Sequence, residues 1–253
     1  MQASRVAYNS FVLYHNFRHA IDVLQSLFYF LLQIGTIPPY PVGSTPPPLS
    51  QEKSPVAQLL TPFQALTLLI SAIGHDVGHP GVNNMFLVKL NAPLAQLYND
   101  QSVLEAFHCA AFSQILRRHW PTVFADKTLR KLLISSILAT DMGVHSDYMQ
   151  QLGNLQEKIH DSKTTDGWAP KDVEACRILT CGLLIKCADI SNVVRANHDS
   201  LYLFHANHLR RDHGWSQNDG RIFYSKSLHL KVRWKTRWEW KPLYLAVRLR
   251  WET

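Results

Sequence analysis

The chain has 253 residues, of which 46% are hydrophobic and 18% are charged, which suits one large domain or two small ones and excludes a disordered chain of high net charge. No apolar run approaches the roughly 20 residues of a membrane-spanning helix, and the four cysteines form no C-x-x-C pair, so we expect a cytoplasmic protein without a membrane span. The net charge of +7 lies mostly in residues 196–253, where 11 Lys and Arg face 5 Asp and Glu, so the body of the chain has no strongly basic surface to explain.

Apolar residues recur with the period of an α-helix in five segments, and the fold class that they predict is all-α. These segments are residues 17–34, 62–73, 101–119, 129–139 and 174–188. Seven of the 13 prolines fall between Pro38 and Pro55, which predicts a Pro-rich loop over residues 38–58. Thr61 before Pro62 is typical of a helix that begins with an N-cap followed by proline.

The last part of the chain, residues 196–253, follows a different pattern. Apolar and polar side chains alternate from Leu228 to Trp240, which is the period of a half-buried strand. Five of the seven tryptophans also lie in this segment. Tryptophan interleaved with Lys and Arg can bind nucleic acid or an anionic membrane surface. A frame change, a retained intron or another mis-joined coding segment gives the same composition. We favour this second interpretation and expect no nucleic-acid partner.

Two histidines, His15 and His19, lie four residues apart at the start of the first predicted helix. If the helix includes both, they point from one face, one turn apart. That geometry can hold a metal ion, but pairs at this spacing are more often ordinary surface or core residues. The pair alone therefore leaves both interpretations open.

A denser cluster of potential ligands lies in residues 74–81, Gly-His-Asp-Val-Gly-His-Pro-Gly. It places His75, Asp76 and His79 within five residues at the end of an apolar helix. Neutral imidazole suits zinc-like ions, and a carboxylate can bridge to a harder second ion. The three glycines leave room for metals and substrate close to the backbone. A helix C-terminus capped by Gly and His is the alternative.

Asp189 follows an apolar run, residues 178–188, at the end of the last predicted helix. A carboxylate there is costly unless it is paired or metal-bound, and exposure of the helix end to solvent is the alternative. Two histidines, a His-Asp doublet and a distant Asp are the ligand set of an HD-type metal site. With these residues in order, the chain resembles the class I cyclic nucleotide phosphodiesterases.

The resemblance runs from Tyr14 to Arg195 and rests on five ordered motifs. They are Tyr-His-Asn-Phe-Arg-His-Ala-Ile-Asp-Val (14–23), Gly-His-Asp-Val-Gly-His-Pro-Gly (74–81), Asn-Asp-Gln-Ser-Val-Leu-Glu (99–105), Leu-Ala-Thr-Asp-Met (138–142) and Lys-Cys-Ala-Asp-Ile-Ser-Asn (186–192). The fold that it implies is a compact multi-helix bundle with metals at its centre, here incomplete and followed by an irregular C-terminal tail.

The resemblance also implies roles for individual residues. The ligands of a tightly held Zn²⁺ match His19, His75, Asp76 and Asp189, and Asp76 matches the bridge to a second ion, Mg²⁺ or Mn²⁺. Groups that hold the water ligands of the second ion match His79, Glu105 and Thr140, with Asp141 beside them. The general acid matches His15. Candidates for the substrate pocket are Tyr14, Met142 and Asn192.

The implied activity is hydrolysis of a 3′,5′-cyclic nucleotide, with cAMP as the expected substrate, to the 5′-monophosphate. A hydroxide that bridges the two ions attacks phosphorus, and the leaving 3′ oxygen takes a proton from His15. The alternative is a catalytically impaired fragment that keeps the metal ligands but lacks the helices that recognise the base. A third possibility is another HD phosphohydrolase, against which the five motifs argue.

The chain departs from the family at two places. Phe107 replaces a histidine of the family's Glu-Asn-His-His sequence near the site. After Arg195 nothing matches: the purine-reading glutamine and the stacking aromatic have no counterpart, and Gln217 is the only later glutamine. We therefore expect a partial catalytic domain over residues 1–195, truncated at both ends, and a non-family basic, Trp-rich tail over residues 196–253. Oligomeric state is not predicted.

Overall fold

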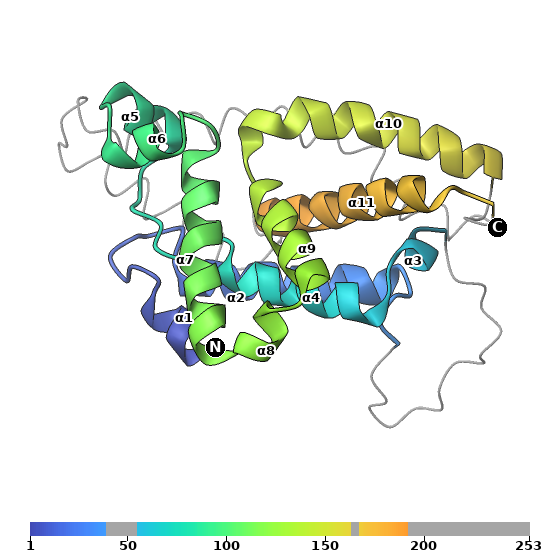
Figure 1. The fold of residues 1–253 in the computed structure, drawn as a ribbon, viewed down its shortest axis with the longest axis horizontal. Coiled ribbons are helices and arrows are strands. Elements are labelled where there is room, and N and C mark those ends of the chain that lie inside the picture. The colour runs from blue at the N-terminus through green and yellow to red at the C-terminus, as the bar shows by residue number, and fades with distance from the viewer. Residues whose placement is uncertain (39–54, 163–166, 192–253) are drawn as a thin grey trace.

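The computed structural model describes residues 1–38, 55–162 and 167–191, and every regular element in these ranges is helical. The elements are α1 (Gln2–Val6), α2 (Phe17–Gln33), α3 (Pro55–Leu59), α4 (Pro62–Gly74), α5 (Asn84–Lys89), α6 (Pro93–Leu97), α7 (Val103–His119), α8 (Pro121–Phe124), α9 (Lys127–Leu138), η1 (Met142–Val144), α10 (His145–Ser162) and α11 (Pro170–Ile190). The predicted all-α class is confirmed for this part of the chain. Figure 1 shows their arrangement.

The five predicted helices correspond to α2, α4, α7, α9 and α11, and side-chain caps account for where several of them begin. Asn16 caps α2 by accepting hydrogen bonds from the backbone N–H groups of Arg18 and His19. Thr61 and Gln64 form a reciprocal capping box at the start of α4. Such a box satisfies two backbone donors that would otherwise lack partners at a helix N-terminus.

The prediction of a loop over residues 38–58 was wrong at its end, because α3 begins at Pro55. Proline is well tolerated at the first position of a helix, where its missing N–H has no intrahelical role. The patterns also missed α10, whose buried apolar residues are only Leu152 and Leu155. The strand predicted from Leu228 to Trp240 lies outside the described residues.

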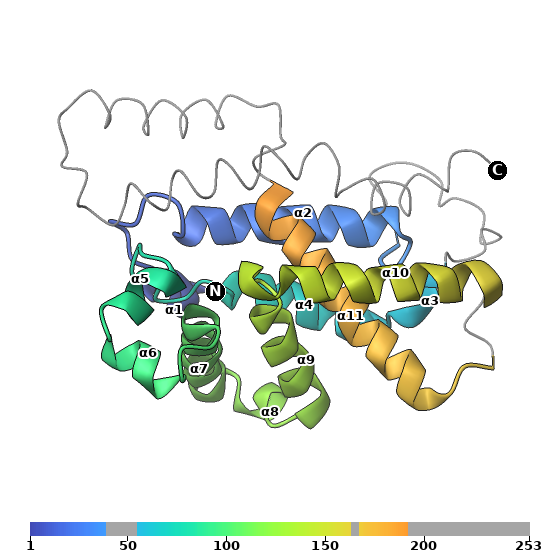
Figure 2. The ribbon, with the colours of Figure 1, turned by 90° about the horizontal axis from the view of Figure 1, so that it is seen from above.

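Three groups of buried side chains hold the helices together. One joins α2, α4 and α11 through residues such as Leu27, Leu68 and Leu184, and α2 and α11 cross near the middle of the molecule (Figure 2). A second joins α7 and α9 to the ends of α2 and α4, and a third joins α10 to α11. Within the described residues, no helix combines the length and apolarity needed to cross a bilayer.

The end of α4 is fixed by close packing against α7. A Cβ atom built on Gly74 would lie 2.1–2.4 Å from ring atoms of Phe112, which is itself buried. Only glycine permits this approach. The junction matters for function because His75 and Asp76 follow Gly74 immediately, so their position depends on the contact between α4 and α7.

Candidate metal centre

Three helix ends supply the central residues of the site. His19 lies in the first turn of α2, His75 is the C-cap of α4 with Asp76 next to it, and Asp189 lies in the last turn of α11. We call His19, His75, Asp76 and Asp189 the ligand cluster. Because α2, α4 and α11 share one packed core, their ends are brought to a common point.

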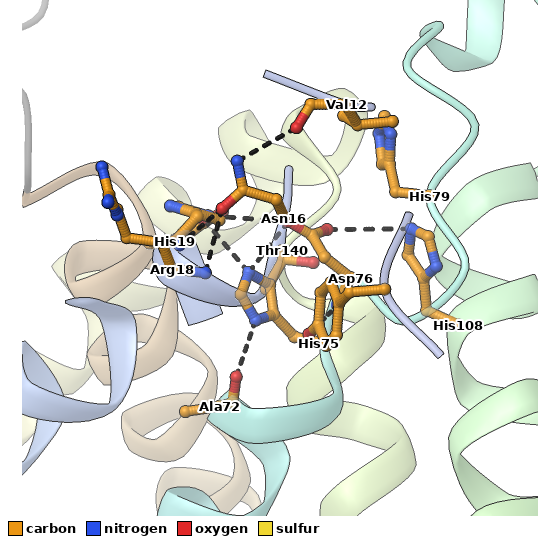
Figure 3. A network of polar contacts seen from close by, with 12 residues as sticks. Val12, Asn16, Arg18, His19, Ala72, His75, Asp76, His79, His108 and Thr140 are labelled. Atoms are coloured by element: carbon orange, nitrogen blue, oxygen red, sulfur yellow. Dashed lines mark hydrogen bonds and ion pairs between the residues drawn. The ribbon is translucent and has the colours of Figure 1, made fainter. Parts of the chain in front are cut away.

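The side chains of the ligand cluster converge at short distances. The His19 Nε2 atom lies 2.9 Å from Asp189 Oδ1 and 3.5 Å from Asp76 Oδ2. The His75 Nε2 atom lies 3.3 Å from Asp76 Oδ2 and 3.4 Å from Asp189 Oδ1. Figure 3 shows His19, His75 and Asp76 turned toward one another. Two imidazoles and two carboxylates thus face one small volume.

The donor set suits a divalent cation. Ligand atoms of His19, His75 and Asp76 all lie within 4.8 Å of one another, and all three residues are buried. The His75 Nδ1 atom contacts the carbonyl oxygen of Ala72 at 2.9 Å, which places the proton on Nδ1 and leaves the Nε2 lone pair facing the cluster. His75 Nε2 and Asp76 Oδ2 are buried without a hydrogen-bond partner. A cation between them would satisfy both.

Asp76 faces two sides of the site with its two oxygens. Oδ2 points to His19 and His75, whereas Oδ1 lies 3.7 Å from the Nε2 atom of His108. His108 is buried on α7 and is fixed by a 2.8 Å contact between its Nδ1 atom and the carbonyl oxygen of Val77. Because its two oxygens have different neighbours, the Asp76 carboxylate could contact two different ions.

The electrostatics of the cluster are dominated by burial and by the two carboxylates. Burial lowers the pKa of His75, but attraction by Asp76 and Asp189 more than offsets it and raises this pKa to about 9. Burial opposes ionisation of Asp76 and Asp189 as well, yet the surrounding histidines hold the pKa of both carboxyls well below the usual range. The cluster is therefore a place where positive charge is strongly favoured, whether from a proton or from a metal ion.

His15 lies beside the ligand cluster and outside it. Since α2 begins at Phe17 and Asn16 is its N-cap, His15 precedes the helix, so the condition under which His15 and His19 would share one helical face is not met. Its ring stacks on His79 with centroids 4.0 Å apart, and its centroid lies 5.8 Å from that of His19. Burial, followed by repulsion from His19, lowers the pKa of His15 to about 4 despite the attraction of Asp76.

His79 and Tyr14 complete the wall around His15. The Nδ1 atom of His79 accepts a hydrogen bond of 3.0 Å from the backbone N–H of Gly81, which places the proton of the neutral ring on Nε2. Burial lowers the pKa of His79, and the neighbouring His15 adds to the effect. The Tyr14 ring lies 4.7 Å, centroid to centroid, from the rings of both His15 and His19.

A second group of polar residues lies farther from the ligands, and we call Asn84, Ser102, Glu105, Thr140 and Asp141 the outer cluster. The Asn84 side-chain amide donates a 2.8 Å hydrogen bond to Glu105 Oε2, and its oxygen accepts from the backbone N–H of Leu104. Burial, and then the negative charge of Asp141, raise the pKa of Glu105 to about 7. One oxygen of the Glu105 carboxyl is thus fixed by a hydrogen bond. At neutral pH the protonated and ionised forms of this carboxyl are close in free energy.

The rest of the outer cluster consists of Thr140 and Asp141, in the turn after α9, and of Ser102, which precedes α7. Thr140 is buried and donates a 2.8 Å hydrogen bond to the carbonyl oxygen of Ile137, so its oxygen keeps lone pairs for a further donor. Asp141 accepts from Ser102 Oγ and from the backbone N–H of Gly143, both at 2.7 Å. Ser102 itself has a positive φ of 41°, an uncommon conformation for a residue with a side chain.

The remaining predicted residues are less well tied to the site. Met142 opens η1 and is half-buried, and Asn192 lies outside the described residues. Phe107 packs over Gly78, where a Cβ would lie 2.8 Å from the Phe107 ring. Gly78 has a φ of +78°, so this loop uses glycine for backbone conformation and packing, in addition to any space for ligands.

Three residues that the sequence reasoning missed belong to the site: Asn84, Ser102 and His108. For His108 a signal existed, because it occupies the second histidine position of the Glu-Asn-His-His pattern in which Phe107 replaces the first. For Asn84 and Ser102 the decisive contacts reach Glu105 and Asp141 across 21 and 39 positions of the chain.

Comparisons with known proteins identify the family to which the chain belongs. A family profile described as 3′5′-cyclic nucleotide phosphodiesterase matches residues 14–201. The 3′,5′-cyclic-nucleotide phosphodiesterase 2 of Saccharomyces cerevisiae is 35% identical over 193 residues, which are 75% of this chain and 28% of that protein. The 3′,5′-cyclic-AMP phosphodiesterase 4C of Mus musculus is 35% identical over 192 residues, which are 73% of this chain and 25% of that protein.

The similarity extends to solved structures. The crystal structure of yeast caPDE2 is 40% identical and gives a TM-score of 0.61 over 76% of this chain and 38% of that chain. The structure of LmjPDEB1 in complex with IBMX is 31% identical and gives a TM-score of 0.59 over 77% of this chain and 52% of that chain. The chain spans only about a quarter of the length of the two curated relatives described above.

Proposed function

This chain belongs to the 3′5′-cyclic nucleotide phosphodiesterase family, and on that premise we propose that it hydrolyses a 3′,5′-cyclic nucleotide to the 5′-monophosphate. The observation that carries the proposal is the convergence of two histidines and two carboxylates beside an additional histidine, His15, that is outside the ligand set. Binding of a phosphate and delivery of a proton need these two kinds of group side by side.

The ligand cluster would hold Zn²⁺, which prefers imidazole and carboxylate ligands, and Asp76 would share its second oxygen with Mg²⁺ or Mn²⁺. When bound, two such cations supply Lewis-acid polarisation of the phosphate and lower the pKa of a shared water from about 16 toward 7. Glu105, Thr140 and His79 would orient the remaining water ligands of the second cation. Asp141 stays in place beside them through Ser102.

His15 would protonate the 3′ oxygen as it leaves. Its ring stacks on His79 and is not a member of the ligand cluster, so it would face the substrate instead of a cation. A bound phosphate carries negative charge, which raises the pKa of a nearby imidazole and opposes the effect of burial. Tyr14 and Met142 would line the entrance. Asn192, the other predicted pocket residue, lies outside the described range.

We propose cAMP as the substrate. The mouse relative, 35% identical, is named for cyclic AMP, whereas the yeast relative is named for cyclic nucleotides in general. Localisation in the cytoplasm stays a prediction from the sequence.

The test uses the full 253-residue chain loaded with Zn²⁺ and Mg²⁺ or Mn²⁺, assayed with cAMP and with cGMP. We expect metal-dependent formation of 5′-AMP, reduced about 10²–10⁴-fold in His15→Gln, which keeps a polar side chain but cannot transfer the proton. Zinc content of the variant should be unchanged because His15 is not a ligand.

Three other outcomes would redirect the assignment. Stoichiometric metal without turnover would identify the catalytically impaired fragment. Hydrolysis of deoxynucleotides but not of cyclic nucleotides would identify another HD phosphohydrolase. Equal turnover by His15→Gln would remove the general acid from the mechanism while leaving the family reaction in place.

A further inference from the structure

Lys186, on α11, is buried, with only 3% of its surface exposed. A buried ammonium group is costly unless its protons find acceptors. Its Nζ atom donates to the carbonyl oxygens of Ala139 and Asp141, at 2.6 and 2.8 Å, and lies 5.2 Å from the centroid of the Tyr148 ring. A charge is thus placed in the interior to hold one short turn of backbone.

The two carbonyl groups flank Thr140. Ala139 is the C-cap of α9, so its oxygen belongs to the helix end that carries partial negative charge and lacks intrahelical donors. With the carbonyl groups of the residues before and after Thr140 bound to one ammonium, the backbone at Thr140 has little freedom to move. The Asp141 carboxylate is fixed separately by Ser102.

Close packing makes this contact possible. A Cβ on Gly182, one turn before Lys186 on α11, would lie 2.6 Å from Tyr148 Cε1 and 3.1 Å from Ala139 Cβ. Glycine at this position lets the turn and the Tyr148 ring reach α11. Asp189 lies three residues beyond Lys186, on the same side of the helix. One turn of α11 therefore carries both a member of the ligand cluster and the group that holds the outer cluster.

We propose that Lys186 is a positioning residue that sets the affinity of the second divalent-cation site by holding the 139–141 turn against α11. The inference rests on the proposed function in one respect, that Thr140 and Asp141 serve the second cation. The Nζ contacts of Lys186 with Ala139 and Asp141 lie at this turn, so its effect should fall on the second cation.

The test is direct metal binding by the full chain, independent of turnover. Chelated protein is reloaded with one equivalent of Zn²⁺ and titrated with Mn²⁺, with free Mn²⁺ followed by electron paramagnetic resonance. Loss of a group that orients metal-binding residues typically weakens metal affinity about 10–100-fold, and we expect that weakening of Mn²⁺ binding in Lys186→Met. Zinc stoichiometry should remain that of the wild type.

A matched control separates positioning from general loss of stability. Leu183→Ala removes a buried side chain from the same helix, in the apolar group that packs against α10, and leaves the Lys186 hydrogen bonds to the 139–141 turn in place. It should lower the melting temperature without weakening Mn²⁺ binding. If Leu183→Ala and Lys186→Met weaken Mn²⁺ binding equally at matched stability, the role of Lys186 is only structural and the proposal is overturned.

A second variant keeps the test decisive if Lys186→Met does not fold. Gly182→Ala retains the lysine but pushes Ala139 and Tyr148 away from α11, and it should also weaken Mn²⁺ binding with zinc retained. Unchanged Mn²⁺ affinity in either folded variant overturns the inference while leaving the proposed function intact. A wild-type chain that binds zinc but no Mn²⁺ overturns both, because the second site itself is then absent.

Discussion

The ligand cluster and the outer cluster are built in different ways. In the ligand cluster, side chains from three helix ends meet directly, with His19 and His75 both within 3.5 Å of Asp76 and Asp189 oxygens. In the outer cluster, the acidic groups are held by hydrogen bonds from other members of the cluster and from backbone, as Glu105 is by Asn84. The geometry of the ligand cluster depends on where helices end, and that of the outer cluster depends on the hydrogen bonds that fix its loops.

The difference predicts how each cluster responds to substitution. Removing a residue of the ligand cluster takes away a ligand atom and leaves buried charges uncompensated. Removing a supporting residue of the outer cluster leaves every functional group present but less well oriented, which costs affinity without abolishing the site. Measurements that treat zinc and manganese separately can therefore confirm or break the distinction.

The largest effect is expected from His75→Ala. His75 is fully buried and its Nε2 atom faces both carboxylates, so the variant loses a ligand that no neighbour can replace. Zinc content, measured by mass spectrometry after dialysis, should fall from about one ion per chain to near zero. His119→Ala, at the exposed end of α7, is the matched control and should bind zinc normally. Zinc retention by His75→Ala would contradict the assignment of the ligand cluster.

A smaller and more selective effect is expected from Asn84→Ala. The variant frees Glu105 Oε2 and removes the acceptor of the Leu104 N–H, so Mn²⁺ affinity should fall about tenfold while zinc remains bound. Its neighbour Asn83 caps α5 by accepting from the Phe86 N–H and does not touch Glu105. Asn83→Ala should cost about 1 kcal/mol of stability but leave Mn²⁺ affinity unchanged. Equal losses from both variants would remove the distinction between positioning and folding.

The smallest effect concerns the pH dependence of stability. The pKa of Glu105 is raised from 4.5 to about 7 in the folded chain, so the folded state favours the protonated carboxyl. That contribution is fully present below the unfolded pKa and is lost as pH rises through 7. In chelated protein, Glu105→Gln should therefore lose less stability than wild type between pH 5 and pH 8, by about 1–2 kcal/mol.

Urea unfolding at the two pH values measures this difference. Glu157→Gln, at an exposed position of α10, is the control and should follow the wild type. Adding Mn²⁺ to the wild type should reduce the difference, because a cation near Glu105 favours the ionised carboxyl. A pH profile identical in wild type and Glu105→Gln would mean that burial does not perturb this carboxyl.

The sequence predicts the ligand cluster and the outer cluster to different extents. His75, Asp76 and Asp189 could be identified because each lies at the end of an apolar helical run, so local periodicity marks both the helix and the polar group at its end. Periodicity over residues 17–34 also agrees with the start of α2 at Phe17. It gave no sign of the cap, Asn16, that begins the helix and leaves His15 outside.

Of the outer cluster, Glu105, Thr140 and Asp141 were predicted only through family resemblance, and Asn84 and Ser102 were not predicted. Nothing local to Glu105 or Asp141 indicates their hydrogen-bond partners, because Asn84 and Ser102 approach them through loop conformations set by tertiary packing. Ser102 needs a positive φ to reach Asp141, and serine does not signal that conformation as glycine would. The sequence patterns missed the α10 helix for a related reason. Its apolar face is narrow because it packs chiefly against α11.

The contact between His19 and Asp189 joins positions 170 residues apart in the chain. A cation held by both would act as a reversible cross-link between the first long helix and the last described one. In the chain-entropy view, closing a loop of that size removes on the order of 4–5 kcal/mol of freedom from the unfolded ensemble. Metal would then govern how tightly the two ends of this helical assembly stay together. Hydrogen exchange with and without a chelator would show it as faster exchange at the ends of α2 and α11.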